Sequence, residues 1–413
     1  MRFPLLPLTV VVALLLAGCT NPVTPPDDDL PVWFIHGLAS QAEVAGRDSL
    51  EWQPMLDAMA DWGWDADELH VVGYYACDSN ESFHVEGYGK PGDDPHAGHI
   101  QRPGWEHNAT TCGGGHDADT TVEHLGYHLA WALHERLDGD CAHMVVHSMG
   151  GLVARYALAR SIEGHSDFPP APCIRGVVAM GTPHIGSDWA NEAWCQPYEC
   201  HQLRDGSPLM QWLHENAQTP RPRADTRWML LGSEADGLVH LPSQMGTVAD
   251  VQLFVHADLL DPLHHGEYWV RTSEASDAPV TWRTAGGTSE WAPDGFWPVR
   301  AVHEFLSGGR PHPSSGISNH APGVREATPP TGAFAIAAGE RVTFEVECES
   351  DPEGHWTFVT ATINGVPREI DQDLPGFSPS MTFRFEPGTH QVQLACQDGL
   401  DVGGVAAWTV NAS

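Results

Sequence analysis

The sequence predicts an α/β fold with a mostly parallel central sheet, followed by a small all-β domain. Between residues 31 and 307, short apolar runs alternate with segments of helical hydrophobic periodicity. Within this region, residues 144–156 have the pattern of a strand, a tight turn and a helix, with a serine at the turn. Beyond residue 330, apolar and polar residues alternate at period two between Gly, Pro and Asp turns, which is typical of a β-sandwich.

The composition limits the partners of the chain. Its 413 residues are enough for two or three domains. Asp and Glu number 55 against 20 Lys and Arg, which gives a net charge of −35, and Lys90 is the only lysine. This charge argues against nucleic acids and anionic membrane surfaces as electrostatic partners.

The first 19 residues predict export from the cytoplasm. Arg2 is followed by an apolar run to Leu16 that is too short for a membrane span and is typical of a signal peptide. The run ends in Leu-Ala-Gly-Cys, which resembles the processing box of bacterial lipoproteins. This resemblance implies that Cys19 becomes the lipidated first residue, anchored at the outer membrane or cell surface; ordinary secretion is the alternative. Residues 20–30, with three prolines and three aspartates, are predicted to be a tether.

Eight further cysteines predict disulfides, because an exported chain folds in an oxidising compartment. Cys141 and Cys173 each begin a predicted strand, and these strands are expected to be neighbours, so we expect the two to pair. The sequence alone does not fix the connectivity, and the economical completions are Cys195–Cys200, Cys77–Cys112 and Cys348–Cys396. No Cys-x-x-Cys motif occurs, so no zinc site is predicted.

The turn at Ser148 has the pattern of a catalytic motif. The apolar run that ends at Val146 is followed by His-Ser-Met-Gly-Gly and then by a helical pattern. Glycine after the serine relieves crowding in a sharp turn, and the start of a helix directs amide groups toward the serine hydroxyl. These residues resemble the nucleophile elbow of the α/β-hydrolase lipases and esterases. Val146 departs from the family, which has a small residue there, so we expect Gly150 and Gly151 to provide the space.

This resemblance implies an α/β-hydrolase fold for residues 31–307, with Ser148 as the nucleophile. The predicted strand 31–35 runs into His-Gly-Leu, where the family begins its oxyanion loop. The amides of Leu38 and Met149 are therefore expected to form the oxyanion hole, in which two N–H groups stabilise the negative oxygen of a tetrahedral intermediate.

The acid of the expected catalytic triad follows a predicted strand at residues 227–231. The turn after this strand contains Asp236 in an Asp-Gly-x-Val segment that matches the family pattern, with Glu234 as the lesser candidate. Such a carboxylate orients the catalytic imidazole and stabilises its charged form. The chain order Ser, Asp, His is that of the α/β-hydrolases.

Three histidines follow the predicted last core strand at residues 251–255. His264 is preferred as the catalytic base, because His264-His265-Gly266 matches the family's His-x-Gly and lies in a loop that lets the ring turn back. His256 is the alternative, since it fits a His-x-x-Leu-Leu variant, but its place at the strand end restricts its reach. His265 is the third candidate.

Three other segments are assigned more simply. Residues 181–187 resemble a Gly-Thr-Pro-His-x-Gly-Ser segment of true lipases, in which His184 is expected to be structural. Residues 188–222 form either a lid or acyl-binding wall, or a packed helix pair. The insertion 76–118 is interpreted as a polar loop, with metal binding as the alternative, and no cofactor is expected. The potential metal ligands of this region are His96, His99, His107, His116 and Asp117, together with Asp119, which directly follows the insertion.

The C-terminal part is predicted to consist of a linker at 308–330 and a β-sandwich at 331–413. The sandwich resembles bacterial immunoglobulin-like or polycystic-kidney-disease-type (PKD-type) repeats, on the Ser-Asp-Pro-Glu-Gly segment at 350–354 and the Asp-Gly-Leu segment at 398–400. It contains no catalytic cluster in its sequence. Attachment to a surface or polymer and a passive spacer are its two interpretations.

Together these features predict an extracytoplasmic serine hydrolase that cleaves carboxylic esters, of the acylglycerol type, through an acyl-enzyme. One alternative is a depolymerase of polyhydroxyalkanoate-type polyesters that uses the β-domain as a substrate anchor. Another is a surface binding protein with an inactive hydrolase scaffold, which Val146 and the uncertain histidine keep open.

Overall fold

The computed structural model describes most of the chain between Leu30 and Ser413. The predicted signal peptide with Cys19, nearly all of the tether and the potential metal ligands between His96 and Asp119 lie outside the described residues. The described residues are 30–38, 49–92, 120–192, 195, 197–257, 262–273, 278–285, 289–292, 295–312, 324–348, 358–364, 366–368, 380–397 and 402–413.

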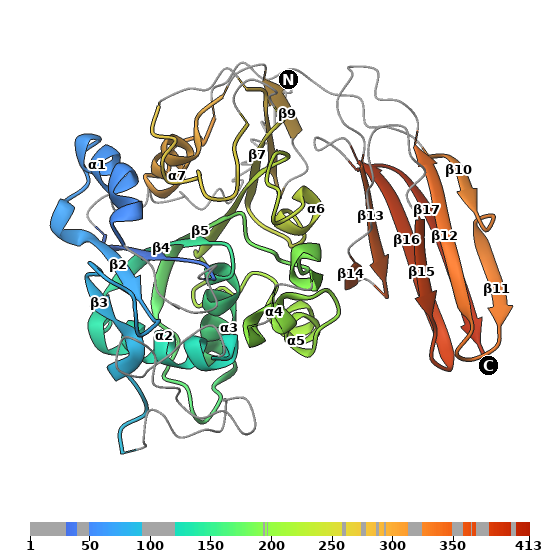
Figure 1. Ribbon diagram of the computed structural model, residues 1–413, viewed down its shortest axis with the longest axis horizontal. Coiled ribbons are helices and arrows are strands. Elements are labelled where there is room, and N and C mark those ends of the chain that lie inside the picture. The colour runs from blue at the N-terminus through green and yellow to red at the C-terminus, as the bar shows by residue number, and fades with distance from the viewer. Residues whose placement is uncertain are drawn as a thin grey trace, which may run out of the picture.

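A nine-stranded sheet forms the centre of the larger domain, in the order β3-β2-β1-β4-β5-β6-β7-β8-β9 (Figure 1). Strands β1 to β7 are parallel to their neighbours, and β8 and β9 add an antiparallel edge. The strands are β1 (Val32–Ile35), β2 (Leu69–Gly73), β3 (Phe83–His84), β4 (Cys141–His147), β5 (Cys173–Met180), β6 (Arg227–Ser233), β7 (Val251–Val255), β8 (Val280–Thr284) and β9 (Ser289–Ala292).

The prediction that residues 251–255 form the last core strand is wrong. Strand β8 continues the sheet beyond β7, with Val255 paired to Val280, and β9 pairs with β8. Strand β8 reads Val-Thr-Trp-Arg-Thr and β9 reads Ser-Glu-Trp-Ala, so polar residues make their hydrophobic pattern weaker than that of the buried parallel strands.

Helices cover both faces of the sheet. The main helices and helical turns are η1 (Ser49–Trp52), α1 (Gln53–Asp61), η2 (Ala66–Glu68), η3 (Val85–Gly87), α2 (Val122–Leu137), α3 (Gly150–Glu163), η4 (Asp188–Asn191), α4 (Tyr198–Leu203), α5 (Pro208–Asn216), α6 (Leu241–Gln244) and α7 (Pro298–Leu306). Successive strand residues point to opposite faces, so Ile35 and Val146 join the core under α2 and α3, while Phe34 and Val145 join the core under α1 and α7. This arrangement confirms the predicted α/β fold class.

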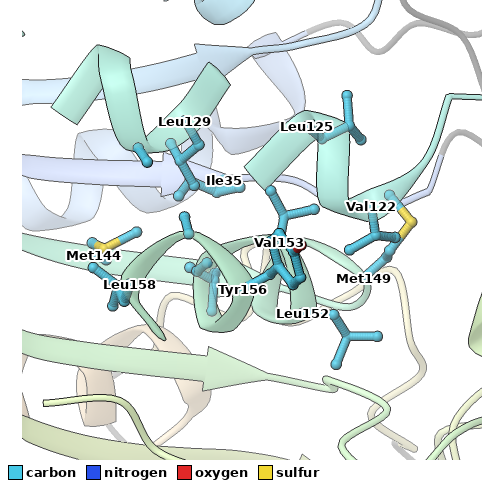
Figure 2. Close-up of a cluster of buried hydrophobic side chains, with 14 of the residues drawn as sticks. Ile35, Val122, Leu125, Leu129, Met144, Met149, Leu152, Val153, Tyr156 and Leu158 are labelled. Atoms are coloured by element: carbon cyan, nitrogen blue, oxygen red, sulfur yellow. The ribbon is translucent and has the colours of Figure 1, made fainter. Parts of the chain in front are cut away.

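Figure 2 shows the core between the sheet and helices α2 and α3. Leu125 and Leu129 of α2 lie near Val153 of α3 and Ile35 of β1, and all four are nearly completely buried. Each such side chain contributes about 2 kcal/mol through burial of apolar surface. The core therefore fixes the position of helix α3, which begins directly after Ser148.

Residues 188–222 are a packed helix pair in their described part, rather than a detached lid. Leu209, Met210 and Leu213 of α5 are buried in the same core as α3. Arg155 of α3 is fully buried and donates hydrogen bonds to the carbonyls of Leu213 and Ala217 at the end of α5. Carbonyls at a helix C-terminus carry partial negative charge, so they stabilise this guanidinium. No described helix has the length and apolar composition of a membrane span.

The C-terminal residues form a sandwich of a three-stranded sheet, β10-β12-β15, and a five-stranded sheet, β11-β17-β16-β13-β14. Phe344 and Trp408 lie at the centre of its core, with ring centroids 5.0 Å apart. The strands are β10 (Val324–Thr328), β11 (Gly332–Ile336), β12 (Arg341–Cys348), β13 (Phe358–Ile363), β14 (Val366–Arg368), β15 (Ser380–Arg384), β16 (Gly388–Gln397) and β17 (Val402–Ala412).

The predicted linker at 308–330 is too long. Residues Val324–Thr328 form β10, which pairs with β12, and Trp408 Nε1 donates a hydrogen bond to the Pro329 carbonyl at 2.7 Å. The sandwich therefore begins at residue 324 and not at 331. Strand β10 is short and lies among Gly, Pro and Ser residues, which concealed it in the sequence.

Three predicted disulfides are confirmed: Cys141–Cys173, Cys195–Cys200 and Cys348–Cys396. Cys141 and Cys173 are register partners at the start of β4 and β5, as the strand prediction required. Cys77 is also disulfide-bonded, but its expected partner Cys112 lies outside the described residues. Disulfides of this number are typical of proteins that fold in an oxidising compartment.

A histidine in the core predicts sensitivity to acid. His143 of β4 is 1% exposed, and burial lowers its pKa to about 4. The unfolded chain takes up a proton at this position below about pH 6.5, whereas the folded chain takes it up only near pH 4, so stability falls as the pH falls between these values. We expect His143→Leu to retain about 2 kcal/mol more stability than the wild type on going from about pH 7.5 to pH 5, measured by urea denaturation.

The matched control is His134→Leu, because His134 lies on the exposed face of α2. An unchanged pH dependence in His143→Leu would contradict this account of the buried histidine.

Candidate active site

Ser148 occupies a strained turn between β4 and α3. Its φ of +54° lies in the left-handed region, which side chains other than glycine rarely adopt. The turn is held by a hydrogen bond from the Ser148 amide to the Met180 carbonyl at the end of β5, at 2.9 Å. The Gly151 amide donates to the Ser148 carbonyl at 3.0 Å. This conformation is the one expected for a nucleophile elbow.

Both glycines after Met149 are required by close packing. A Cβ on Gly150 would lie 2.3 Å from the His36 carbonyl oxygen, and a Cβ on Gly151 would lie 2.2 Å from Thr182 Oγ1. The start of α3 is thereby pressed against the loop after β1 and the turn after β5. Val146 causes no crowding at the serine, because its side chain is fully buried in the core under α2 and α3.

Three side chains converge at the turn. His265 Nε2 lies 2.9 Å from Ser148 Oγ, and His265 Nδ1 lies 2.7 Å from Asp236 Oδ2. The other Asp236 oxygen, Oδ1, accepts hydrogen bonds from the amides of Leu238 and Val239, both at 3.0 Å. The side chain of Asp236 is fully buried, and that of His265 is 11% exposed. The arrangement can move a proton from the hydroxyl to the imidazole while the carboxylate orients the ring.

The prediction of His264 as the base does not agree with the geometry of the site, in which His265 contacts Ser148 and His264 does not. His264 is exposed, and its Nδ1 lies 3.2 Å from the Ala235 carbonyl. Its amide donates to Glu267 Oε2 at 2.9 Å, which fixes the start of the turn. Neighbouring side chains in this loop point in different directions, so His265 alone of the pair reaches Ser148. The family's His-x-Gly pattern does not contain the side-chain direction that distinguishes His265 from His264.

The two lesser candidates, His256 and Glu234, contact each other. His256 Nδ1 lies 3.1 Å from Glu234 Oε1, and His256 Nε2 lies 2.7 Å from Thr281 Oγ1 of β8. Glu234 also accepts a hydrogen bond from the Ala257 amide at 2.9 Å. This pair connects the turn after β6 with the ends of β7 and β8. Because β8 was not predicted, this structural role of His256 and Glu234 was not apparent from the sequence.

The loop after β1 lies against the serine. A Cβ on Gly37 would lie 2.5 Å from Ser148 Cβ and 3.0 Å from Oγ. Leu38 is the residue after Gly37, and Met149 is the residue after Ser148. Both predicted oxyanion residues are therefore adjacent in sequence to residues of this close contact. Their amides remain predicted donors.

The sequence did not indicate the residues that hold this loop. The Tyr74 hydroxyl donates to the His36 carbonyl at 2.5 Å, and the two rings stack with centroids 4.0 Å apart. His36 Nε2 lies 2.9 Å from Asp78 Oδ2, which also accepts a hydrogen bond from the Tyr74 amide at 2.6 Å. Tyr74 and Asp78 lie at and after the end of β2, where the irregular insertion obscured any pattern.

A metal centre is not apparent in the part of the chain that the structure describes, because no group of three or more His, Cys, Asp or Glu side chains converges there. The potential ligands of the insertion lie outside that part. His184 is buried beside Arg155, which lies 3.2 Å from its Nδ1, and burial followed by the charge of Arg155 lowers its pKa well below 6.5. This position is away from the three converging side chains and agrees with the expected structural role.

Comparisons with known proteins give only distant similarities. No family model and no curated protein matches the chain. The lipase BlEst2 of Bacillus licheniformis is 19% identical, with 52% of this chain and 71% of that one covered and a TM-score of 0.31. The phospholipase PlaB of Legionella pneumophila is 13% identical, with 56% and 47% covered and a TM-score of 0.34. Fibronectin(III)-like modules of Clostridium thermocellum CbhA are 14% identical, with 21% and 97% covered and a TM-score of 0.18.

The contact between Gly37 and Ser148 gives a direct test of the site. Gly37→Ala forces the loop and the serine apart, and a displacement on the order of 1 Å can slow a reaction about a hundredfold. We expect the rate of covalent labelling of Ser148 by a fluorophosphonate to fall by about this factor.

Gly87→Ala is the control, because a Cβ there meets no atom within 4 Å. Labelling of Gly37→Ala at the wild-type rate would show that the loop does not constrain the serine.

Proposed function

We propose that this protein is a serine hydrolase that cleaves carboxylic esters through an acyl-enzyme. The observation that carries the proposal is the continuous contact from Ser148 Oγ through the His265 ring to Asp236 Oδ2. A serine hydroxyl is a weak nucleophile until an adjacent base accepts its proton. In this site His265 Nε2 is the only base within hydrogen-bond distance of Oγ among the described residues.

The reaction proceeds in two halves. Ser148 Oγ attacks the ester carbonyl while His265 Nε2 accepts its proton, and the same proton then passes to the departing alcohol as the C–O bond breaks. Water attacks the acyl-enzyme in the same manner, which releases the carboxylic acid and restores the serine. Asp236 stabilises the imidazolium in both halves. The amides of Leu38 and Met149 stabilise the oxyanion of each tetrahedral intermediate.

The proposed substrate is an acylglycerol-type ester, and the proposed location is outside the cytoplasm. The first inference rests on the resemblance of residues 181–187 to the corresponding lipase segment, and the second on the predicted signal peptide and lipidated Cys19. The three disulfides support an oxidising compartment. No cofactor takes part in the proposed reaction.

Alanine substitutions test the assignment of the triad. We expect Ser148→Ala and His265→Ala to lower kcat for p-nitrophenyl butyrate by about a thousandfold or more, since each removes a member of the reacting group. His264→Ala and His256→Ala retain hydrolysis within about tenfold of the wild type, because neither ring reaches Ser148. His264→Ala serves as the matched control for its neighbour.

Loss of activity in His264→Ala with an active His265→Ala would refute the proposed base. A folded wild-type protein that neither hydrolyses the ester nor reacts with a fluorophosphonate would favour the alternative of an inactive binding protein.

A further inference from the structure

We propose that Tyr268 is a positioning residue whose hydroxyl holds the Asp236 carboxylate against His265 and shares its negative charge. This inference rests on the proposed function. Tyr268 is not a member of the proposed triad, and the triad chemistry alone does not require it.

The Asp236 carboxylate receives four hydrogen bonds. Oδ1 accepts two backbone amides of the following turn, at 3.0 Å each. Oδ2 is the oxygen that faces His265 Nδ1, and it is also 3.2 Å from the Tyr268 hydroxyl. The two amides hold Oδ1, and Tyr268 and His265 both contact Oδ2. Tyr268 therefore acts on the same oxygen that orients the base.

Gln244 of α6 holds the phenol from its other side. The side chain of Gln244 is locked, because Nε2 donates to the carbonyls of Ser233 and Val239 while Oε1 accepts the Ser233 amide at 2.8 Å. The Tyr268 hydroxyl lies 3.1 Å from Gln244 Oε1. One O–H proton thus has two acceptors at similar distances, a charged carboxylate and a neutral amide oxygen. Hydrogen bonds to a charged acceptor are the stronger ones, so the proton is shared in favour of Asp236.

Tyr268 remains a donor throughout the working pH range. Its side chain is fully buried, and burial together with the negative charge of Asp236 raises its pKa well above 10. The sharing of the Oδ2 charge weakens the pull of the carboxylate on the proton of His265 Nδ1. Without Tyr268, the undivided charge of Asp236 Oδ2 would stabilise the protonated imidazole more strongly.

Other titratable groups surround this contact, and all of them are retained in Tyr268→Phe. The His147 ring centroid lies 5.8 Å from that of Tyr268, and its Nε2 lies 2.9 Å from the His265 carbonyl. His264 and Glu267 belong to the same loop and contact each other on its exposed side. Beyond the turn that carries Asp236 is the pair of Glu234 and His256.

The experiment compares Tyr268→Phe with Tyr75→Phe in the full-length protein. Tyr75 is a matched control, because it is also fully buried and its hydroxyl also donates to a carboxylate, Glu199 Oε2, at 2.6 Å. For p-nitrophenyl butyrate we expect Tyr268→Phe to lower kcat about tenfold with little change in KM, since the carboxylate that orients His265 loses one of its hydrogen bonds and is positioned less firmly. The acid limb of the pH profile of kcat/KM moves to higher pH. Tyr75→Phe leaves kcat and the limb at their wild-type values.

A second variant predicts the opposite shift. Gln244→Leu removes the competing acceptor, so the Tyr268 proton goes entirely to Asp236 and the acid limb moves to lower pH. This result keeps the inference testable should Tyr268→Phe fail to fold, which its thermal unfolding midpoint reports.

The possible outcomes distinguish a failure of the role of Tyr268 from a failure of the proposed function. An active wild type with an unshifted acid limb in Tyr268→Phe overturns the role of Tyr268 and leaves the triad intact. An equal loss of kcat in Tyr268→Phe and Tyr75→Phe would reflect a general loss of core stability, and it would also overturn the role of Tyr268. A wild type without hydrolysis refutes the proposed function and this inference with it.

Discussion

The close approach of the turn at Ser148 to the loop after β1 is the constraint on which the site depends. At Gly37 and Gly150 there is no room for a Cβ atom, since one would meet Ser148 Cβ and the other the His36 carbonyl. Ser148 has a left-handed backbone as a result of this packing. The hydrogen bond from its amide to the Met180 carbonyl and the buried face of α3 keep it in this conformation. Strain of this kind persists only when the surrounding structure determines it from several sides.

The sheet then brings distant residues to the serine. Ser148 follows β4, Asp236 follows β6, and His265 lies in the loop after β7. In a parallel sheet the carboxyl ends of the strands share one edge, so residues that follow different strands meet although they are far apart in sequence. Each is then fixed locally: Asp236 by two amides and a phenol, and His265 by its two contacts and by the hydrogen bond between its carbonyl and His147.

The predictable parts of the site are those that lie immediately beside a strand. Ser148 and Asp236 could be identified because an apolar run and a turn define each position within one or two residues. The histidine could not, because it lies ten residues after β7 and has a neighbour of the same type. Only side-chain direction distinguishes His264 from His265, and periodicity carries no information about direction in an irregular loop. Tyr268 and Gln244 could not be predicted for a related reason. Tyr268 contacts Asp236 from a separate loop, and Gln244 contacts Tyr268 from α6. The same limit applies to β8, β9 and β10, in which polar residues interrupt the apolar pattern.

The account depends most directly on Ser148 being an activated nucleophile. The deciding measurement is the mass of the intact protein after brief exposure to a fluorophosphonate, followed by identification of the modified peptide. The account predicts one adduct per chain, located on Ser148. A folded protein that forms no adduct, or one modified at a different residue, would contradict it.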